Sequence, residues 1–147
     1  MSDRRRPDAA ERNKVVVIES KAKALEVAKV AQDKKGQNVT IIGVEGRNSY
    51  TDYLVIATAY SDRQTRAIAN AIEDELRDKR GLALLGREGR TGWIILDYGD
   101  IVVHIFHEDT RAHYDLDRMW ATAPRVRVPP PEIWHDREPP MAHALDH

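Results

Sequence analysis

Two aspartates and a histidine are the first candidates for chemistry, within the stretch "GWIILDYGDIVVHIF" at residues 92–106. Asp97 and Asp100 lie three positions apart and close to His104. Paired carboxylates beside an imidazole could hold a metal ion or transfer protons. However, acids that flank a glycine-containing turn more often accept hydrogen bonds from backbone N–H groups. We therefore expect Asp97 and Asp100 to cap a turn, and we rank an acid–base site below that interpretation.

A metal site built from the histidines near His104 is the second chemical possibility. His107 follows three positions later, and Glu108 and Asp109 come directly after it. His104 belongs to an expected strand, however, where residues three apart point to opposite faces. A packed or solvated histidine is the better interpretation, so we expect no metal and no cofactor. The sequence also contains neither a phosphate-binding glycine loop nor a G-x-S-x-G nucleophile motif, and it does not predict an enzyme.

The composition of the chain narrows the class of protein. Its 147 residues suit one domain, and 41% apolar with 32% charged residues are typical of a globular protein. The formal net charge is −1, whereas proteins that bind nucleic acid through many phosphates carry a positive excess, so we expect little direct nucleic-acid binding. The absence of cysteine excludes disulfides and thiolate chemistry. No apolar run reaches the roughly 20 residues that span a bilayer, and we expect a cytoplasmic protein.

Three segments are expected along the chain. Residues 1–14 are charged and predict a flexible leader, and the Pro-rich residues 124–147 predict an extended or disordered tail. Between them, residues 15–123 predict one α/β domain. Residues 15–20 fit either a strand or the lead-in to a helix that Ser20 caps.

The clearest single element is a helix at residues 61–81. Ser61 and Gln64 form a capping box at its start, and Gly81 ends it. The other expected elements are a helix that Gly36 ends, strands at 38–46 and 51–60, an edge strand within 82–89, and a broken helix at 107–120. The second of these strands is apolar on both faces, which is typical of the middle of a sheet. The order of elements predicts a mixed β-sheet flanked by helices.

Residues 92–106 are expected to form a hairpin with Tyr98 and Gly99 as its two turn residues. This register places Trp93 opposite His104. Because side chains alternate between the two faces of a strand, one face is aliphatic and the other is mixed. The mixed face carries Trp93, Ile95, Asp97, Asp100, Val102, His104 and Phe106. Composition alone gives about equal weight to packing under another element and to binding a partner.

Two blocks of the sequence resemble the ribosomal silencing factor family, also called the Iojap family. They are T-D-Y-x-V-I-A-T with a following S-x-x-Q, and W-x-x-L-D-Y-G-D-x-V-V-H-x-F with a following R and Y-x-L-x-x-x-W. The resemblance covers about residues 20–122 and leaves the leader and the tail outside. It implies a fold like that of nucleotidyltransferases without the catalytic motif. Leu54 stands where a second acid would follow Asp52, and residues 47–50 lack the Gly-Ser pair.

The resemblance also implies a function. It implies a factor that binds the large ribosomal subunit through ribosomal protein L-fourteen, blocks association with the small subunit, and represses translation under nutrient limitation or in stationary phase. A homodimer is compatible with the family. The implied partner-binding residues are Trp93, Asp97, Tyr98, Gly99, Asp100, His104, Phe106 and Arg111. The alternatives are a nucleotide-binding or nucleotidyltransferase enzyme of the same fold, and a metal-dependent hydrolase that uses His104, His107 and Asp100.

Overall fold

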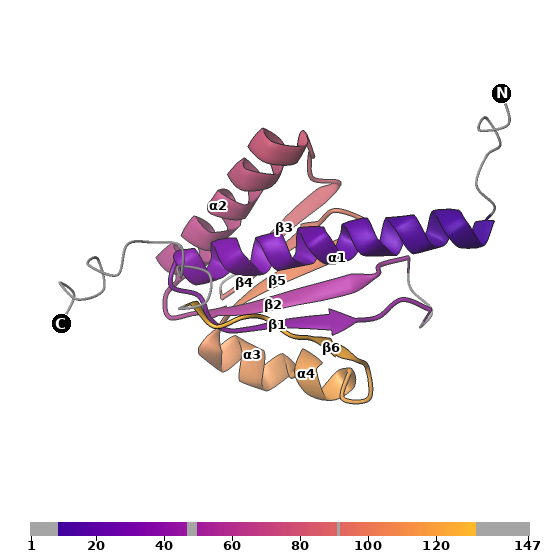
Figure 1. Ribbon diagram of the computed structural model, residues 1–147. Helices are drawn as coiled ribbons and strands as arrows, with labels where there is room; N and C mark the ends of the chain where they lie inside the picture. Colours follow the sequence, from indigo (N-terminus) through magenta and orange to yellow (C-terminus); the bar gives the residue numbers. More distant parts are fainter. Residues whose placement is uncertain (1–8, 47–49, 91, 132–147) are drawn as a thin grey trace, which may run out of the picture.

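A six-stranded β-sheet lies between two layers of helices in the computed structural model, which describes residues 9–46, 50–90 and 92–131 (Figure 1). The elements in chain order are α1 (Ala9–Asp33), β1 (Gln37–Gly43), β2 (Tyr53–Ala59), α2 (Asp62–Arg80), β3 (Gly86–Arg90), β4 (Trp93–Asp97), β5 (Ile101–His107), α3 (Glu108–Tyr114), α4 (Leu116–Met119) and β6 (Arg125–Val126). The strand order is β3-β4-β5-β2-β1-β6. β2 and β5 are parallel and the other neighbours are antiparallel, which confirms the predicted mixed sheet flanked by helices.

Each face of the sheet has its own hydrophobic core. α1 and α2 cover one face, where Val27 and Ile72 pack with Val103 of the sheet. α3 and α4 lie on the opposite face, where Phe106 and Ile56 are fully buried. Burying a large apolar side chain stabilises the fold by about 1.5–3 kcal/mol. β2 contributes to both cores, which confirms the prediction that it is a central strand.

α1 differs from the expectation at its start. It begins at Ala9, so residues 15–20 are helical and Ser20 lies buried in the middle of the helix instead of capping it. The β-branched residues of that stretch favour a strand, but such a preference is weak and the stretch is helical. The helix begins inside the segment expected to be a flexible leader. Residues 1–8 lie outside the described part of the chain, and the domain boundaries stay a prediction.

The end of α1 also differs in detail. Lys35, and not Gly36, adopts the left-handed conformation, with φ 69°. The N–H of Gly36 then donates to the carbonyl of Ala31 at 2.8 Å. A Cβ at Gly36 would come within 2.7 Å of that carbonyl oxygen. Glycine is therefore favoured at position 36 because a side chain would clash with this carbonyl, and not because of its φ angle.

α2 has the predicted cap in a modified form. The Ser61 hydroxyl accepts a hydrogen bond from the N–H of Gln64 at 3.0 Å, and Gly81 ends the helix with φ 64°. The reciprocal bond differs from a capping box, because the side-chain oxygen Oε1 of Gln64 accepts from the N–H of Tyr60, and not from that of Ser61, at 2.7 Å. The Gln64 amide also donates to the carbonyl of Lys35 at 3.0 Å. Gln64 thus connects the start of α2 to the end of α1.

The two edges of the sheet are formed by segments for which an edge strand and an extended tail were predicted. β3 forms one edge, as predicted, but it spans Gly86–Arg90 and not the whole of 82–89, and all five of its residues are exposed. β6 forms the other edge, where Arg125 pairs with Ile42, so the start of the expected tail is an extended segment that packs on the sheet. Residues 132–147 lie outside the described residues. The helix expected at 107–120 is broken at Asp115, where φ is 46°, and is confirmed as α3 and α4.

The register of the β4–β5 hairpin corrects the expected one. Trp93 pairs with Phe106, and His104 pairs with Ile95. The turn residues are Gly99 and Asp100, since the N–H of Tyr98 donates to the carbonyl of Ile101 at 3.0 Å. Moving a two-residue turn by one position shifts the pairing by two residues, and the side-chain period of a strand is also two. The predicted division into an aliphatic and a mixed face is therefore confirmed for the strand residues although the pairing was wrong. Asp100, which was expected on the mixed face, lies instead in the turn and contacts α1 on the aliphatic side.

Candidate functional site

The mixed face of the hairpin carries a cluster of aromatic rings. The ring of Trp93 on β4 lies 4.8 Å from that of Phe106 on β5 and 4.4 Å from that of Tyr114 on α3, measured between centroids. Cross-strand pairing places the first two side by side, and α3 brings the third over them. Phe106 is fully buried, while 45% of Tyr114 is exposed. Rings in such contact contribute roughly 0.5–1.5 kcal/mol beyond the area that they bury.

His104 belongs to the same cluster and has a specific partner. The indole N–H of Trp93 donates a hydrogen bond to Nδ1 of His104 at 3.1 Å. Burial lowers the pKa of His104 to about 4. The imidazole is therefore neutral near pH 7, and the bond from Trp93 fixes Nδ1 as its acceptor nitrogen. His104 consequently acts as a packed hydrogen-bond acceptor here, in agreement with the preference for a packed histidine over a metal ligand.

Two hollows in the surface flank the indole of Trp93, and we call them together the Trp93 groove. The larger, of about 280 Å³, is lined by Arg90, Trp93, Asp109, Thr110, His113 and Tyr114. The smaller, of about 70 Å³, is lined by Glu88, Arg90, Trp93 and Ile95. Both lie beside β3, the edge strand of the sheet. The groove thus combines aromatic walls, charged side chains and an open sheet edge.

The turn at the far end of the hairpin is held by its acids in two different ways. Asp97 accepts a hydrogen bond from the N–H of Gly99 at 2.8 Å, which is the expected capping role. Asp100 does not cap, and that part of the prediction was wrong. Its carboxylate accepts from the hydroxyl of Ser20 at 2.6 Å and forms an ion pair with Lys23, both on α1. Asp100 therefore connects the turn to the helical layer.

Asp52 takes part in the same contact. Its Oδ2 lies 3.0 Å from the Ser20 hydroxyl, which has a single proton to donate. Burial by itself raises the pKa of Asp100, but hydrogen bonds from Lys23 and Ser20 outweigh burial and leave that pKa below its ordinary value. The two carboxylates are thus engaged by a hydroxyl and an ammonium group. Within the described residues, no three His, Cys, Asp or Glu side chains are grouped to hold a metal ion.

Arg111 and Tyr98 are buried inside the fold. The Arg111 guanidinium forms two bonds to Asp117, at 3.0 and 3.1 Å, and donates to Thr58 Oγ1 at 2.9 Å and to the carbonyl of Asn38 at 2.5 Å. It therefore joins α3 and α4 to β1 and β2. Tyr98 packs in the α1–α2 core, where burial first, and then the charge of Glu73, raises its pKa to about 12. Both side chains have a structural role.

The eight residues expected at the site therefore fall into three places. Trp93, His104 and Phe106 form one cluster, whereas Asp97, Tyr98, Gly99 and Asp100 lie at the turn, and Arg111 lies on the buried side of α3. Sequence reasoning missed Tyr114 as a wall of the Trp93 groove, although its apolar spacing within residues 107–120 was visible. It also missed Ser20 and Lys23 as partners of Asp100, because 80 residues separate Ser20 from Asp100 and no local pattern connects them.

The arrangement of the elements is shared with solved structures. A protein from Chromobacterium violaceum superposes with a TM-score of 0.63 at 29% identity, covering 71% of this chain and 86% of that one. A protein from Bacillus halodurans gives a TM-score of 0.59 at 33% identity, covering 71% and 96%. The fold thus defines an α/β protein of the class to which these two proteins belong.

Relatives and a family model supply the identification. Residues 17–145 match the family model described as ribosomal silencing factor during starvation, and this match extends beyond the 20–122 expected from the motifs. A ribosomal silencing factor of Bacillus subtilis is 37% identical over 99 residues, which are 66% of this chain and 83% of the relative. The chloroplastic protein Iojap of Arabidopsis thaliana is 34% identical over 111 residues, 76% of this chain and 47% of the relative. The chain belongs to the ribosomal silencing factor family.

Membership of this family supports a ribosome-associated role in silencing translation, which is regulatory rather than catalytic. The resemblance inferred from the two sequence blocks is therefore confirmed. None of the helices within the described residues has the length and apolar character needed to cross a membrane.

Proposed function

We propose that this protein binds the large ribosomal subunit through ribosomal protein L-fourteen, acts in the cytoplasm, and sterically blocks association with the small subunit under nutrient limitation or in stationary phase. The observation that carries the proposal is the Trp93 groove of a ribosomal silencing factor: a half-buried indole and a 45% exposed Tyr114 beside an open sheet edge. Partly exposed aromatic side chains in a hollow are typical anchors of protein interfaces.

The buried members of the expected site support this surface from beneath. Phe106 lies under the indole of Trp93, and Arg111 fixes α3, which carries Tyr114. Trp93, Asp97 and His104 keep partly exposed side chains. In the proposed complex, Trp93 and Tyr114 contact the ribosomal protein, whereas Phe106, Tyr98 and Arg111 position the contacting residues.

The proposed mechanism requires binding alone. Each partner of a standard interface buries roughly 800 Å², and the loss of one central aromatic anchor costs about 2 kcal/mol or more. That cost corresponds to roughly 30-fold in affinity. An obstacle on the subunit-joining surface of the large subunit excludes the small subunit without any chemical step.

Co-sedimentation with purified large subunits tests the proposal. Wild-type protein should travel with the subunit, and Tyr114→Ala should weaken binding roughly 30-fold, to the large subunit and to isolated ribosomal protein L-fourteen alike. The matched control is Tyr60→Ala, because Tyr60 is 57% exposed and lies outside the groove. Wild-type protein that remains at the top of the gradient would contradict the proposal. So would equal effects of the two tyrosine variants.

Nucleotide transfer is the competing function, because Asp52 and Asp100 directly precede two parallel neighbouring strands and both reach Ser20. Calorimetry with magnesium and ATP or CTP separates the two functions. Heat of binding that disappears in Asp52→Ala would favour an enzyme, and its absence would favour the silencing factor. We also propose that the free protein self-associates into a homodimer, which sedimentation equilibrium of the free protein tests.

A further inference from the structure

A hollow separate from the Trp93 groove lies on the other side of the β3 edge. None of the eight residues expected at the site lines it. It has a volume of about 260 Å³ and lies between the first turns of α2 and the β3–β4 hairpin. Its lining residues are Asp62, Thr65, Arg66, Arg87, Gly89, Arg90, Gly92 and Ile94. Three arginines from two elements converge on it, and we call it the arginine pocket. A convergence of guanidinium groups is typical of sites for phosphate or carboxylate.

The charges of the pocket leave two guanidinium groups available. Arg87 is ion-paired with Glu73 and donates to Asn70 at 3.0 Å. The Asp62 carboxylate lines the pocket and accepts a hydrogen bond from the N–H of Gly92 at 3.1 Å. Arg66 and Arg90 are exposed, and neither forms an ion pair with another described residue. An incoming anion would therefore find two arginines that form no ion pair within the described residues, with the Asp62 carboxylate as the one acid that lines the pocket.

The arginine pocket adjoins the Trp93 groove at Arg90. Arg90 lines both hollows of the groove and the pocket as well. A macromolecule that docks on the groove therefore brings its own surroundings against the pocket. On the large ribosomal subunit, the ribosomal protein to which the groove binds has phosphates of ribosomal RNA beside it.

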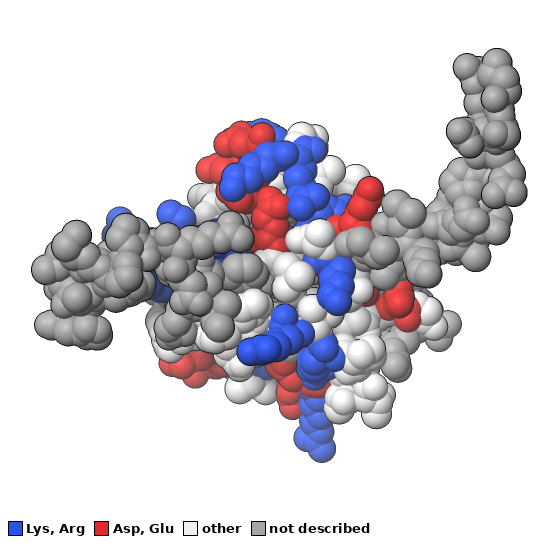
Figure 2. Space-filling view, in the orientation of Figure 1, with Lys and Arg blue, Asp and Glu red and all other residues white. Residues whose placement is uncertain are grey.

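We propose that the arginine pocket binds a backbone phosphate of ribosomal RNA beside the protein partner, with Arg66 and Arg90 as its ligands. The proposal rests on the proposed function, because it places the groove against the subunit. It agrees with a net charge of −1, since one phosphate contact needs no basic sheath. Lys and Arg are interspersed with Asp and Glu over the face shown in Figure 2, so that face presents no broad positive field.

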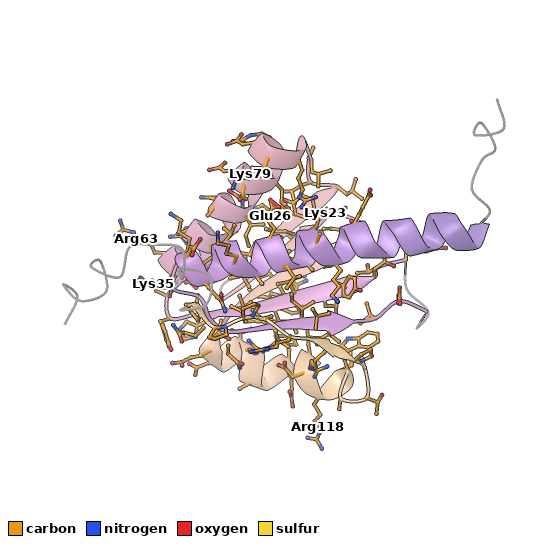
Figure 3. The ribbon with its side chains drawn as sticks, in the orientation of Figure 1. Lys23, Glu26, Lys35, Arg63, Lys79 and Arg118 are labelled. Atoms are coloured by element: carbon orange, nitrogen blue, oxygen red, sulfur yellow. The ribbon has the colours of Figure 1, made fainter. Side chains whose placement is uncertain are left out.

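Arg66→Ala is the test variant, because Arg66 lines the pocket and does not line the groove. Arg63→Ala is the matched control. Arg63 lies on the same helix three residues earlier, is exposed, and points away from the body of the molecule (Figure 3). The affinity of each variant is measured for whole large subunits and for isolated ribosomal protein L-fourteen, in KCl from 50 to 200 mM.

Arg66→Ala should weaken binding to the whole subunit about tenfold at 50 mM KCl and lower the slope of log affinity against log salt by about 1. It should leave the affinity for the isolated ribosomal protein unchanged, and Arg63→Ala should match wild type in every measurement. An unchanged slope in Arg66→Ala would overturn the phosphate contact, and so would an equal loss against the isolated protein. If wild-type protein fails to bind the subunit at all, the proposed function itself fails.

Cross-linking identifies the class of macromolecule directly. A photoreactive benzoylphenylalanine at position 66 should cross-link to ribosomal RNA when the protein is bound to the large subunit. The same group at position 63 should give no such product. A cross-link from position 66 to a ribosomal protein alone, or no cross-link from a bound protein, would overturn the proposal.

Discussion

The hydroxyl of Ser20 donates a hydrogen bond to the carboxylate of Asp100 at 2.6 Å, across 80 residues of sequence. Ser20 lies in the middle of α1, and Asp100 is the second residue of the turn that joins β4 to β5. Lys23, less than one turn further along α1, pairs with the same carboxylate. The three residues fix the hairpin against the helical layer, and the other side of this hairpin carries the aromatic cluster.

Asp100→Ala should lower the free energy of unfolding by about 2 kcal/mol, because it removes the short hydrogen bond from Ser20 and the ion pair with Lys23 at a partly buried position. Urea unfolding followed by circular dichroism measures the change. The control is Asp74→Ala, since Asp74 pairs with Arg77 at an exposed site and its loss should cost less than about 0.5 kcal/mol. Equal losses of unfolding free energy in the two variants would show that the contact of Asp100 with α1 stabilises the fold no more than an exposed ion pair does.

The buried imidazole of His104 should make the folded protein less stable in mild acid. Burial lowers its folded pKa to about 4 from an ordinary 6.5, so the folded state resists protonation. The stabilisation is complete above pH 6.5 and declines as the pH falls toward 4, by at most about 3 kcal/mol. His104→Gln keeps an acceptor for Trp93 and does not titrate, so its stability should change less between pH 6.5 and 4. Urea unfolding at several pH values measures the difference, and an equal pH dependence of wild type and His104→Gln would contradict the role of His104.

Arg111→Lys tests the buried guanidinium. Lysine cannot reproduce the paired bonds to Asp117 together with those to Thr58 and Asn38, so the variant should be about 3 kcal/mol less stable. Arg118→Lys is the matched control, because Arg118 points from α4 into solvent (Figure 3). Thermal unfolding of both variants against wild type measures the difference. Similar melting temperatures for both would contradict a structural role for Arg111.

Gly92→Ala tests the close approach of α3 to the hairpin. Gly92 has φ 77°, and a Cβ there would lie 2.7 Å from Oγ1 of Thr110. We expect a loss of about 2–3 kcal/mol, from backbone strain and the clash together. Gly81→Ala separates the two causes, since Gly81 has φ 64° but open space around it, and should cost about 1 kcal/mol. If the two variants lose the same stability, the contact with Thr110 is unimportant.

The sequence allowed the mixed face of the hairpin to be predicted, although the predicted register was wrong. Trp93, His104 and Phe106 share a face in either register, because the error of two residues equals the side-chain period of a strand. The capping of the turn by Asp97 was equally predictable, since it depends on neighbours within two residues.

Contacts between distant segments could not be predicted in the same way. Asp100 could have capped the turn like Asp97, and only the passage of α1 beside the turn gives it Ser20 and Lys23 instead. That passage depends on α1 being helical through residues 15–20, although β-branched residues disfavour a helix there. The arginine pocket likewise requires α2 and β3 to meet, and no spacing in the sequence joins Arg66 to Arg90.

Light scattering of ribosomal subunits tests the central claim most directly. Purified small and large subunits are mixed after the large subunits have been incubated with the protein, and the increase in scattering reports association. Wild-type protein should abolish that increase when it saturates the large subunits, whereas Tyr114→Ala should need roughly 30-fold more protein and Tyr60→Ala no more than wild type. Undiminished association of large subunits that carry the bound wild-type protein would contradict the account.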